Sequence, residues 1–142
     1  MGRVINTEGS GQERTRLTKA VVLAIRELMR QTETNEKTYD LAAFIVLALK
    51  EIASTIDTSV AAWEKRGYWV KADRFRMEWD WTETLGERMK TALLAEDWPS
   101  VAQISIQVAG KLGDIKVSER HRLGTPWVGA WDRLKNPAKS RS

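Results

Sequence analysis

The chain has 142 residues, of which 42% are hydrophobic and 30% are charged, and its formal net charge is +4. This length suits one domain with a sizeable core, and this balance is typical of a folded globular protein rather than a disordered one. There is no cysteine, which excludes disulfides, thiolate metal sites and cysteine nucleophiles.

The sequence also indicates where the protein works. The first residues contain no apolar run of the kind found in a secretory signal, and the longest apolar run, residues 41–49, is far shorter than the roughly 20 residues that span a bilayer. The absence of cysteine fits a reducing compartment. We therefore expect a cytoplasmic, soluble protein with no membrane span.

Charge is distributed unevenly along the chain. Residues 1–31 hold six basic and three acidic residues, residues 32–113 hold ten basic and thirteen acidic ones, and residues 114–142 hold seven basic and three acidic ones. The middle is mildly acidic and both ends are basic. An anionic partner is therefore expected to meet the ends.

The first 30 residues predict an arm followed by a helix. Residues 1–10 lack hydrophobic periodicity and are expected to be flexible. Ser10 and Glu13 have the spacing of a capping box, which places the helix start near Gly11 and its end near Arg30. The apolar residues of this helix recur at intervals of three and four, as on one helical face: Leu17, Val21, Ala24, Ile25 and Leu28.

A second helix is expected over residues 38–65, after a polar connector at residues 31–37. Around residues 41–49 its apolar side chains cover nearly the whole circumference. A helix of this kind is buried between several neighbours or lies at a subunit interface.

Gly67 is the expected turn between the second helix and a third, over residues 68–95, because glycine accepts the left-handed conformation that ends a helix. One continuous helix of more than fifty residues remains the alternative. The third helix has a heptad-like apolar seam, which favours an antiparallel partner: Tyr68, Ala72, Phe75, Trp79, Thr82, Gly86, Met89 and Leu93.

The last third of the chain predicts two more helices. Asp97 before Pro99 marks the start of a helix over residues 99–112, and Thr125 before Pro126 marks a short one over residues 127–134. We therefore predict an all-α fold, an up-and-down bundle of four main helices with a short C-terminal helix and basic flexible ends. The bundle is a single domain at residues 11–135, followed by a basic tail at residues 136–142.

Residues that would indicate catalysis are scarce. The only histidine, His121, has Ser118 rather than glutamate three residues before it, so the Glu-x-x-His motif of metal-binding bundles is absent. The segment from Gly9 to Gly11 is too short for a phosphate-binding loop. We expect no enzyme activity, no cofactor and no metal, although a carboxylate-only site for a hard cation remains open.

The segment at residues 63–81 interleaves aromatic and basic side chains, the combination that grips nucleic acid by contacting phosphates and stacking on bases. Trp69 and Trp81 fall off the apolar seam and are the rings expected to be available, with Lys71 and Arg74 beside them. The alternative is plain packing with a solvated face, because Arg74–Glu78 and Arg76–Asp80 have the i,i+4 spacing of ion pairs.

Basic residues near the two ends form a second candidate surface. Its members Arg14, Arg16, Arg120 and Arg122 would meet an anionic partner if the ends converge. The last helix, with Trp127 and Trp131, is expected to close the bundle, or alternatively to dock on a protein or a membrane surface.

Together these features predict a small binding module, a subunit of a larger assembly that contacts nucleic acid (RNA or DNA) or an acidic protein through its basic ends. The alternative is a structural protein that self-associates through its second helix together with Trp127 and Trp131, with no nucleic-acid role.

Overall fold

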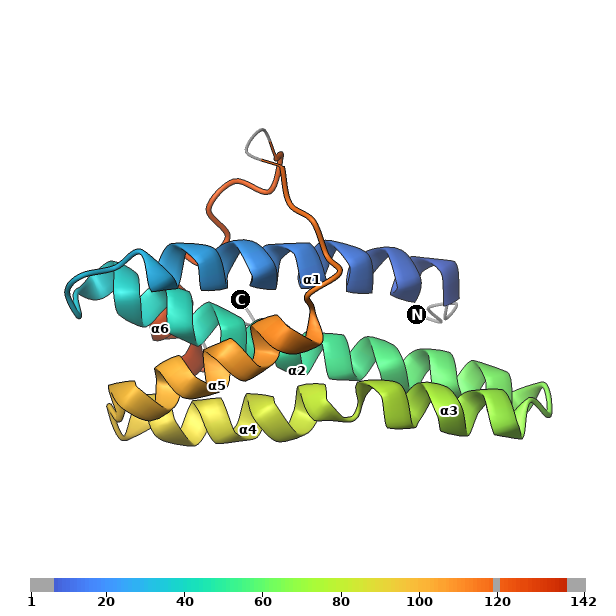
Figure 1. Ribbon diagram of the computed structural model, residues 1–142. Coiled ribbons are helices and arrows are strands. Elements are labelled where there is room, and N and C mark those ends of the chain that lie inside the picture. The colour runs from blue at the N-terminus through green and yellow to red at the C-terminus, as the bar shows by residue number, and fades with distance from the viewer. Residues whose placement is uncertain (1–6, 119–120, 138–142) are drawn as a thin grey trace.

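A computed structural model describes residues 7–118 and 121–137, and Figure 1 shows their arrangement. The helices are α1 (Thr7–Met29), α2 (Glu36–Lys65), α3 (Trp69–Trp79), α4 (Trp81–Leu94), α5 (Trp98–Lys111) and α6 (Ala130–Lys135). The described residues contain no strand, which confirms the all-α prediction. No helix among them is long and apolar enough to cross a bilayer.

The helices run up and down around α2 (Figure 1). The helices α1, α3, α4 and α6 all pack against α2, while α5 packs on α4 and also touches α1. At one end α1, α2, α4 and α5 form a four-helix bundle. At the other end only the start of α1, the end of α2 and α3 lie together, and α5 does not reach them.

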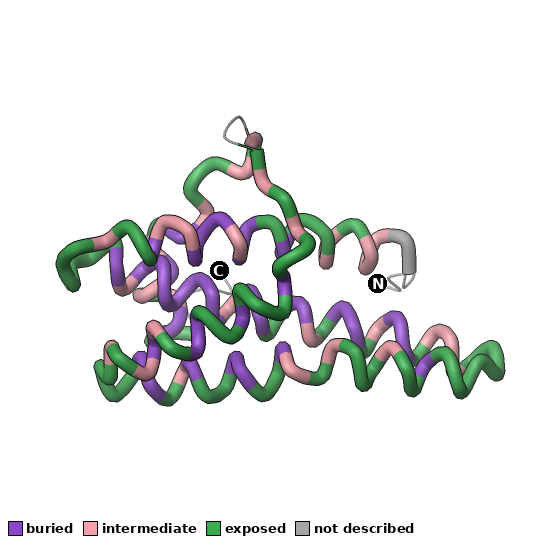
Figure 2. The backbone as a smooth tube through the Cα atoms, viewed as in Figure 1, coloured by how far each residue is buried: buried purple, intermediate pink, exposed green. Residues whose placement is uncertain are grey.

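The apolar circumference of α2 explains this arrangement. Every residue from position 41 to position 46 is buried, and Leu41, Ile45, Leu49 and Ile52 are completely inaccessible to solvent. Figure 2 shows buried residues along α2 that give way to exposed ones around α3. The prediction that several neighbours bury this helix is confirmed, and helices of the same chain are the neighbours.

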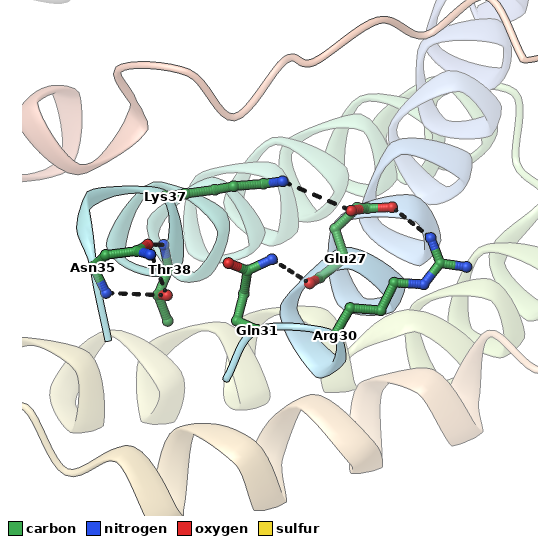
Figure 3. A network of polar contacts seen from close by, with 6 residues as sticks. All are labelled: Glu27, Arg30, Gln31, Asn35, Lys37 and Thr38. Carbon is green, nitrogen blue, oxygen red and sulfur yellow. Dashed lines mark hydrogen bonds and ion pairs between the residues drawn. The ribbon is translucent and has the colours of Figure 1, made fainter. Parts of the chain in front are cut away.

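The turn between α1 and α2 is held by polar contacts, shown in Figure 3. The Asn35 side chain accepts a hydrogen bond from the Thr38 backbone N–H (3.2 Å), and the Asn35 N–H donates to the Thr38 hydroxyl (3.3 Å). This capping box starts α2 two residues before the predicted position. The Glu27 carboxylate meets Arg30 at 3.0 Å and Lys37 at 3.9 Å, and so joins the two helices.

The predicted capping box at Ser10 is wrong. The chain is already helical at Thr7, so Ser10 and Glu13 lie inside α1 rather than at its start. A capping residue must adopt an extended conformation, which a residue within a helix does not have. The Glu13 carboxylate instead pairs with Arg16, one turn further along.

The turn at Gly67 is confirmed, because its φ of +82° lies in the left-handed region. The helix predicted after it is interrupted at Asp80, which separates α3 from α4. There the Thr82 hydroxyl donates to the Trp79 carbonyl (2.8 Å), a side-chain bond that competes with the helical ladder. Most of the predicted seam is buried or half-buried, but Tyr68 is exposed because it precedes α3.

The start of α5 agrees closely with prediction, since the Asp97 side chain accepts from the Ser100 N–H (3.3 Å) and Pro99 lies in the first turn. The start of α6 does not. Residues 126–129 form a turn, and α6 begins at Ala130 after Gly129, whose φ is +82°. Trp127 lies in this turn rather than in α6, and it is nevertheless buried against the bundle.

The cap of α6 comes from α2. One carboxylate oxygen of the buried Asp40 accepts from the Gly129 N–H (3.0 Å), and the other accepts from the Trp131 N–H (2.9 Å). A carboxylate at a helix N-terminus satisfies free donors and interacts favourably with the helix dipole. Asp40 therefore fixes the C-terminal segment to the centre of the bundle.

We expect Asp40→Ala to lower the free energy of unfolding by about 2 kcal/mol, because hydrogen bonds to a charged group are lost and two partly buried N–H donors are left without their partner. Urea unfolding measures this, and hydrogen exchange at the Gly129 and Trp131 amides locates it. Asp97→Ala, which removes an exposed cap, is the matched control and should cost about 1 kcal/mol. Unchanged exchange at both amides in Asp40→Ala would contradict this role.

A second prediction concerns the contact of α4 with α2. A Cβ placed on Gly86 would lie 3.3 Å from the Leu49 Cβ, an atom held by the buried backbone of α2. Gly86→Ala should therefore destabilise the fold by about 1 kcal/mol despite the higher helix propensity of alanine. Gly110→Ala, in α5 with nothing within 4 Å, should stabilise it by roughly 0.5–1 kcal/mol. Thermal unfolding of both variants checks the opposite signs.

Candidate functional site

The hairpin formed by α2 and α3 ends in an exposed apolar and basic surface, here called the hairpin tip (residues 65–74). Tyr68 is 52% exposed, Trp69 61% and Val70 68%. Four cationic side chains of the tip are exposed as well: Lys65, Arg66, Lys71 and Arg74. Large exposed apolar side chains in a row are unusual on a soluble surface and often indicate an interaction site.

The backbone of the tip explains why these side chains face solvent. The Gly67 N–H donates to the Glu64 carbonyl (2.9 Å) and the Tyr68 N–H donates to the Trp63 carbonyl (2.9 Å), the two bonds of a Schellman motif. This motif ends α2 and directs the chain sharply away from it. The residues that follow Gly67 therefore leave the end of the hairpin before α3 turns back along α2.

A small apolar cluster supports the tip from below. Its buried members are Ile56, Val60 and Ala72, and the rings of Trp63, Phe75 and Trp79 pack around them. The Trp63 and Phe75 ring centroids are 4.9 Å apart in an edge-to-face arrangement. Phe75 and Trp79 are thus packing residues, as predicted from the seam.

The charges of the tip do not balance locally. The Arg76 guanidinium pairs with Glu64 at 3.0 Å and with Asp73 at 2.8 Å. These bonds, chiefly the one to Glu64, raise the pKa of Arg76 from its ordinary value. The i,i+4 partners expected from the sequence, Arg74–Glu78 and Arg76–Asp80, are therefore not the pairs that form.

Both carboxylates near the tip therefore have the same ion-pair partner, Arg76. The four tip cations make no ion pair with any residue that the structure describes. Lys71 has a different partner, because its Nζ lies 4.6 Å from the centroid of the Trp63 ring. This cation–π contact holds the ammonium group at the surface without neutralising it.

The basic residues of α1 have other roles. The Arg14 guanidinium lies 4.8 Å from the Phe75 ring centroid and 5.9 Å from that of Trp79, and it donates to the Thr55 hydroxyl at 3.3 Å. Burial lowers the pKa of Arg14 from its ordinary value. Arg14 thus joins α1 to the small cluster, and Arg16 is paired with Glu13.

The remaining candidates do not converge with the tip. Trp81 is half-buried and stacked on Trp79, with ring centroids 6.1 Å apart and planes 23° apart. Arg122 is exposed in the connector between α5 and α6. The described part of this connector extends past α1, away from α3, in Figure 1. Arg120 lies outside the described residues. The structure therefore brings together Trp69, Lys71 and Arg74, and within residues 7–118 and 121–137 no surface made from both ends of the chain is seen.

The sequence places Tyr68, Lys65 and Arg66 in the aromatic and basic segment at residues 63–81, but they are not among the candidate binding residues selected from it. Tyr68 fits the spacing of the apolar seam, which predicts a packing role. Lys65 and Arg66 stand at the C-terminal end of the second predicted helix, where basic residues interact favourably with the helix dipole. The sequence feature that indicates their exposure is their position beside Gly67. Residues on both sides of a turn glycine lie at the end of a hairpin, where the neighbouring helices do not cover them.

The described residues contain no group of three histidine, cysteine, aspartate or glutamate side chains arranged to hold a metal ion. The Nδ1 atom of His121 accepts a hydrogen bond from the Leu123 N–H (3.2 Å) within the connector. The chain matches no protein family model, no curated protein and no solved structure.

The packing role of Arg14 is testable. Arg14→Ala should lower the free energy of unfolding by about 1–2 kcal/mol, because a cation–π contact and buried methylene groups are lost together. Arg14→Met keeps most of the apolar packing and should cost less than half as much. Denaturant unfolding measures both. Equal losses in the two variants would mean that the charge, rather than the packing, matters.

Proposed function

We propose that this chain is a small helical binding module that contacts nucleic acid through the hairpin tip. One observation carries the proposal: Arg76 pairs with both Glu64 and Asp73, which leaves four cations without carboxylate partners around two exposed aromatic rings. The contact surface is thus the tip rather than the two basic ends of the chain.

Phosphate groups suit this surface for electrostatic reasons. Neutralising phosphates releases condensed counterions, which gives affinity that depends strongly on salt. Four cations correspond to a slope of about −3 to −4 in a plot of log affinity against log salt concentration. An exposed ring such as Trp69 adds a stacking surface that an acidic protein would not use in this way.

The module is proposed to act as a subunit of a larger assembly, because four cations alone give modest affinity and added contacts raise it by avidity. The absence of cysteine fits a cytoplasmic setting. Self-association through α2 has less support, since α1, α3, α4 and α6 cover that helix, and Trp127 is buried.

The deciding experiment neutralises the tip. We expect the triple variant Lys65→Gln, Arg66→Gln and Arg74→Gln to bind labelled RNA and DNA oligonucleotides more weakly than wild type, with a salt slope smaller in magnitude by about 2 to 3. Fluorescence polarisation between about 50 and 200 mM salt measures both quantities.

The matched control removes the same charge elsewhere, with Lys50→Gln, Arg88→Gln and Lys111→Gln on exposed positions of α2, α4 and α5. It should bind as wild type does. Equal weakening of both triple variants would show that net charge, rather than the tip, drives binding and would overturn the proposal. Binding of polyglutamate but of no oligonucleotide would assign the tip to an acidic protein instead.

A further inference from the structure

We infer that the hairpin tip accepts a single strand rather than a duplex, with one base stacked on the ring of Trp69. This inference rests on the proposed function and specifies the form of nucleic acid that the tip selects. Three features support it: the exposure of Trp69, the open surface beside its ring, and the side chains on the outer face of α3.

Trp69 differs from the other tryptophans of the chain. All seven lie in the described part, and Trp69 alone is exposed, with 61% of its surface accessible. Five of the others contact a neighbouring aromatic ring, and Trp127 is buried. Trp69 has no such ring contact within the described chain, so its ring has area available to a ligand.

The surface beside Trp69 is open. Gly67, Tyr68, Trp69, Val70 and Lys71 line a shallow depression at the end of the hairpin. A Cβ placed on Gly67 would meet nothing within 4 Å beyond its two chain neighbours, so no residue from elsewhere in the described chain fills the space over the turn. A planar base therefore has room to approach the ring.

Cations lie on both sides of this depression along the chain. Lys65 and Arg66 are at the end of α2, and Lys71 and Arg74 are on α3, one turn apart at a rise of about 4.5 Å. A strand that stacks one base on Trp69 can place the phosphates before and after that base near cations of the two helices. The surface is small, which fits a site of about four nucleotides.

A duplex fits less well for two reasons. Its bases are already stacked on one another, so none offers a free face to Trp69. The outer face of α3 presents Val70 and Met77, which are 68% and 73% exposed, together with the carboxylate of Asp73. Two apolar side chains and an acid beside the single guanidinium of Arg74 supply few hydrogen-bond donors for phosphates or base edges in a groove.

The test compares Trp69→Phe with Trp69→Leu. Phenylalanine keeps a ring that stacks, whereas leucine keeps apolar volume without one. We expect Trp69→Leu to weaken binding of a single-stranded oligonucleotide by about ten-fold, and Trp69→Phe to weaken it by much less. Wild type should bind the single strand more tightly than the duplex of the same sequence, and neither variant should change duplex binding.

Photocrosslinking tests the contact of a base with Trp69 in the wild-type protein, so it does not depend on the folding of a variant. Photocrosslinking of wild type to a 5-bromouridine-substituted single strand, followed by mass spectrometry, should identify the peptide that contains Trp69. Circular dichroism of both variants confirms that their helical content is unchanged, as expected for an exposed side chain.

Failure of the single-strand inference and failure of the proposed function give different results. Equal affinity for both forms, with Trp69→Leu behaving as wild type while the tip triple variant still weakens binding, would overturn the single-strand inference and leave the proposed function standing. No binding of either form would overturn both. Binding of Trp69→Leu equal to that of Trp69→Phe would show that apolar area, rather than stacking, is used, and would also overturn the inference.

Discussion

The apolar circumference of α2 constrains the positions of α1, α3, α4 and α6, and α4 in turn carries α5. A helix with a single apolar stripe needs one neighbour, whereas this one needs neighbours on all sides. Complete burial of Leu41, Ile45, Leu49 and Ile52 stabilises the fold by about 1.5–3 kcal/mol for each side chain. The close approach at Gly86 and the cap from Asp40 are both means of holding neighbours against α2.

The neighbours do not extend along the whole of α2, and this difference separates core from candidate site. The large cluster lies where α1, α2, α4 and α5 meet, whereas the small cluster of Ile56, Val60 and Ala72 has only α1 and α3 to close it. Beyond the small cluster no helix of the described chain covers the hairpin, so the side chains around Gly67 are exposed. The candidate site thus follows from where the covering helices end.

Features fixed by local sequence could be predicted, and features that need a distant partner could not. The Gly67 turn and the Asp97 cap depend on residues a few positions apart, and both were predicted correctly. The cap of α6 is Asp40, about ninety residues away, and the partner of Arg14 is a ring cluster on α3. Neither relation leaves a pattern in sequence spacing.

The same distinction applies to the candidate site. Trp69, Lys71 and Arg74 can be identified from the sequence because the aromatic and basic residues of this surface are close together along the chain. That Lys71 and Arg74 lack ion pairs depends on Arg76, which binds Glu64 across the hairpin rather than Asp80 one turn ahead. A further consequence concerns dynamics: the proposed binding end rests on three buried side chains, so it should open in local fluctuations that leave the four-helix end intact. A ligand there would suppress those fluctuations, and the ordering cost would limit its affinity while favouring rapid release.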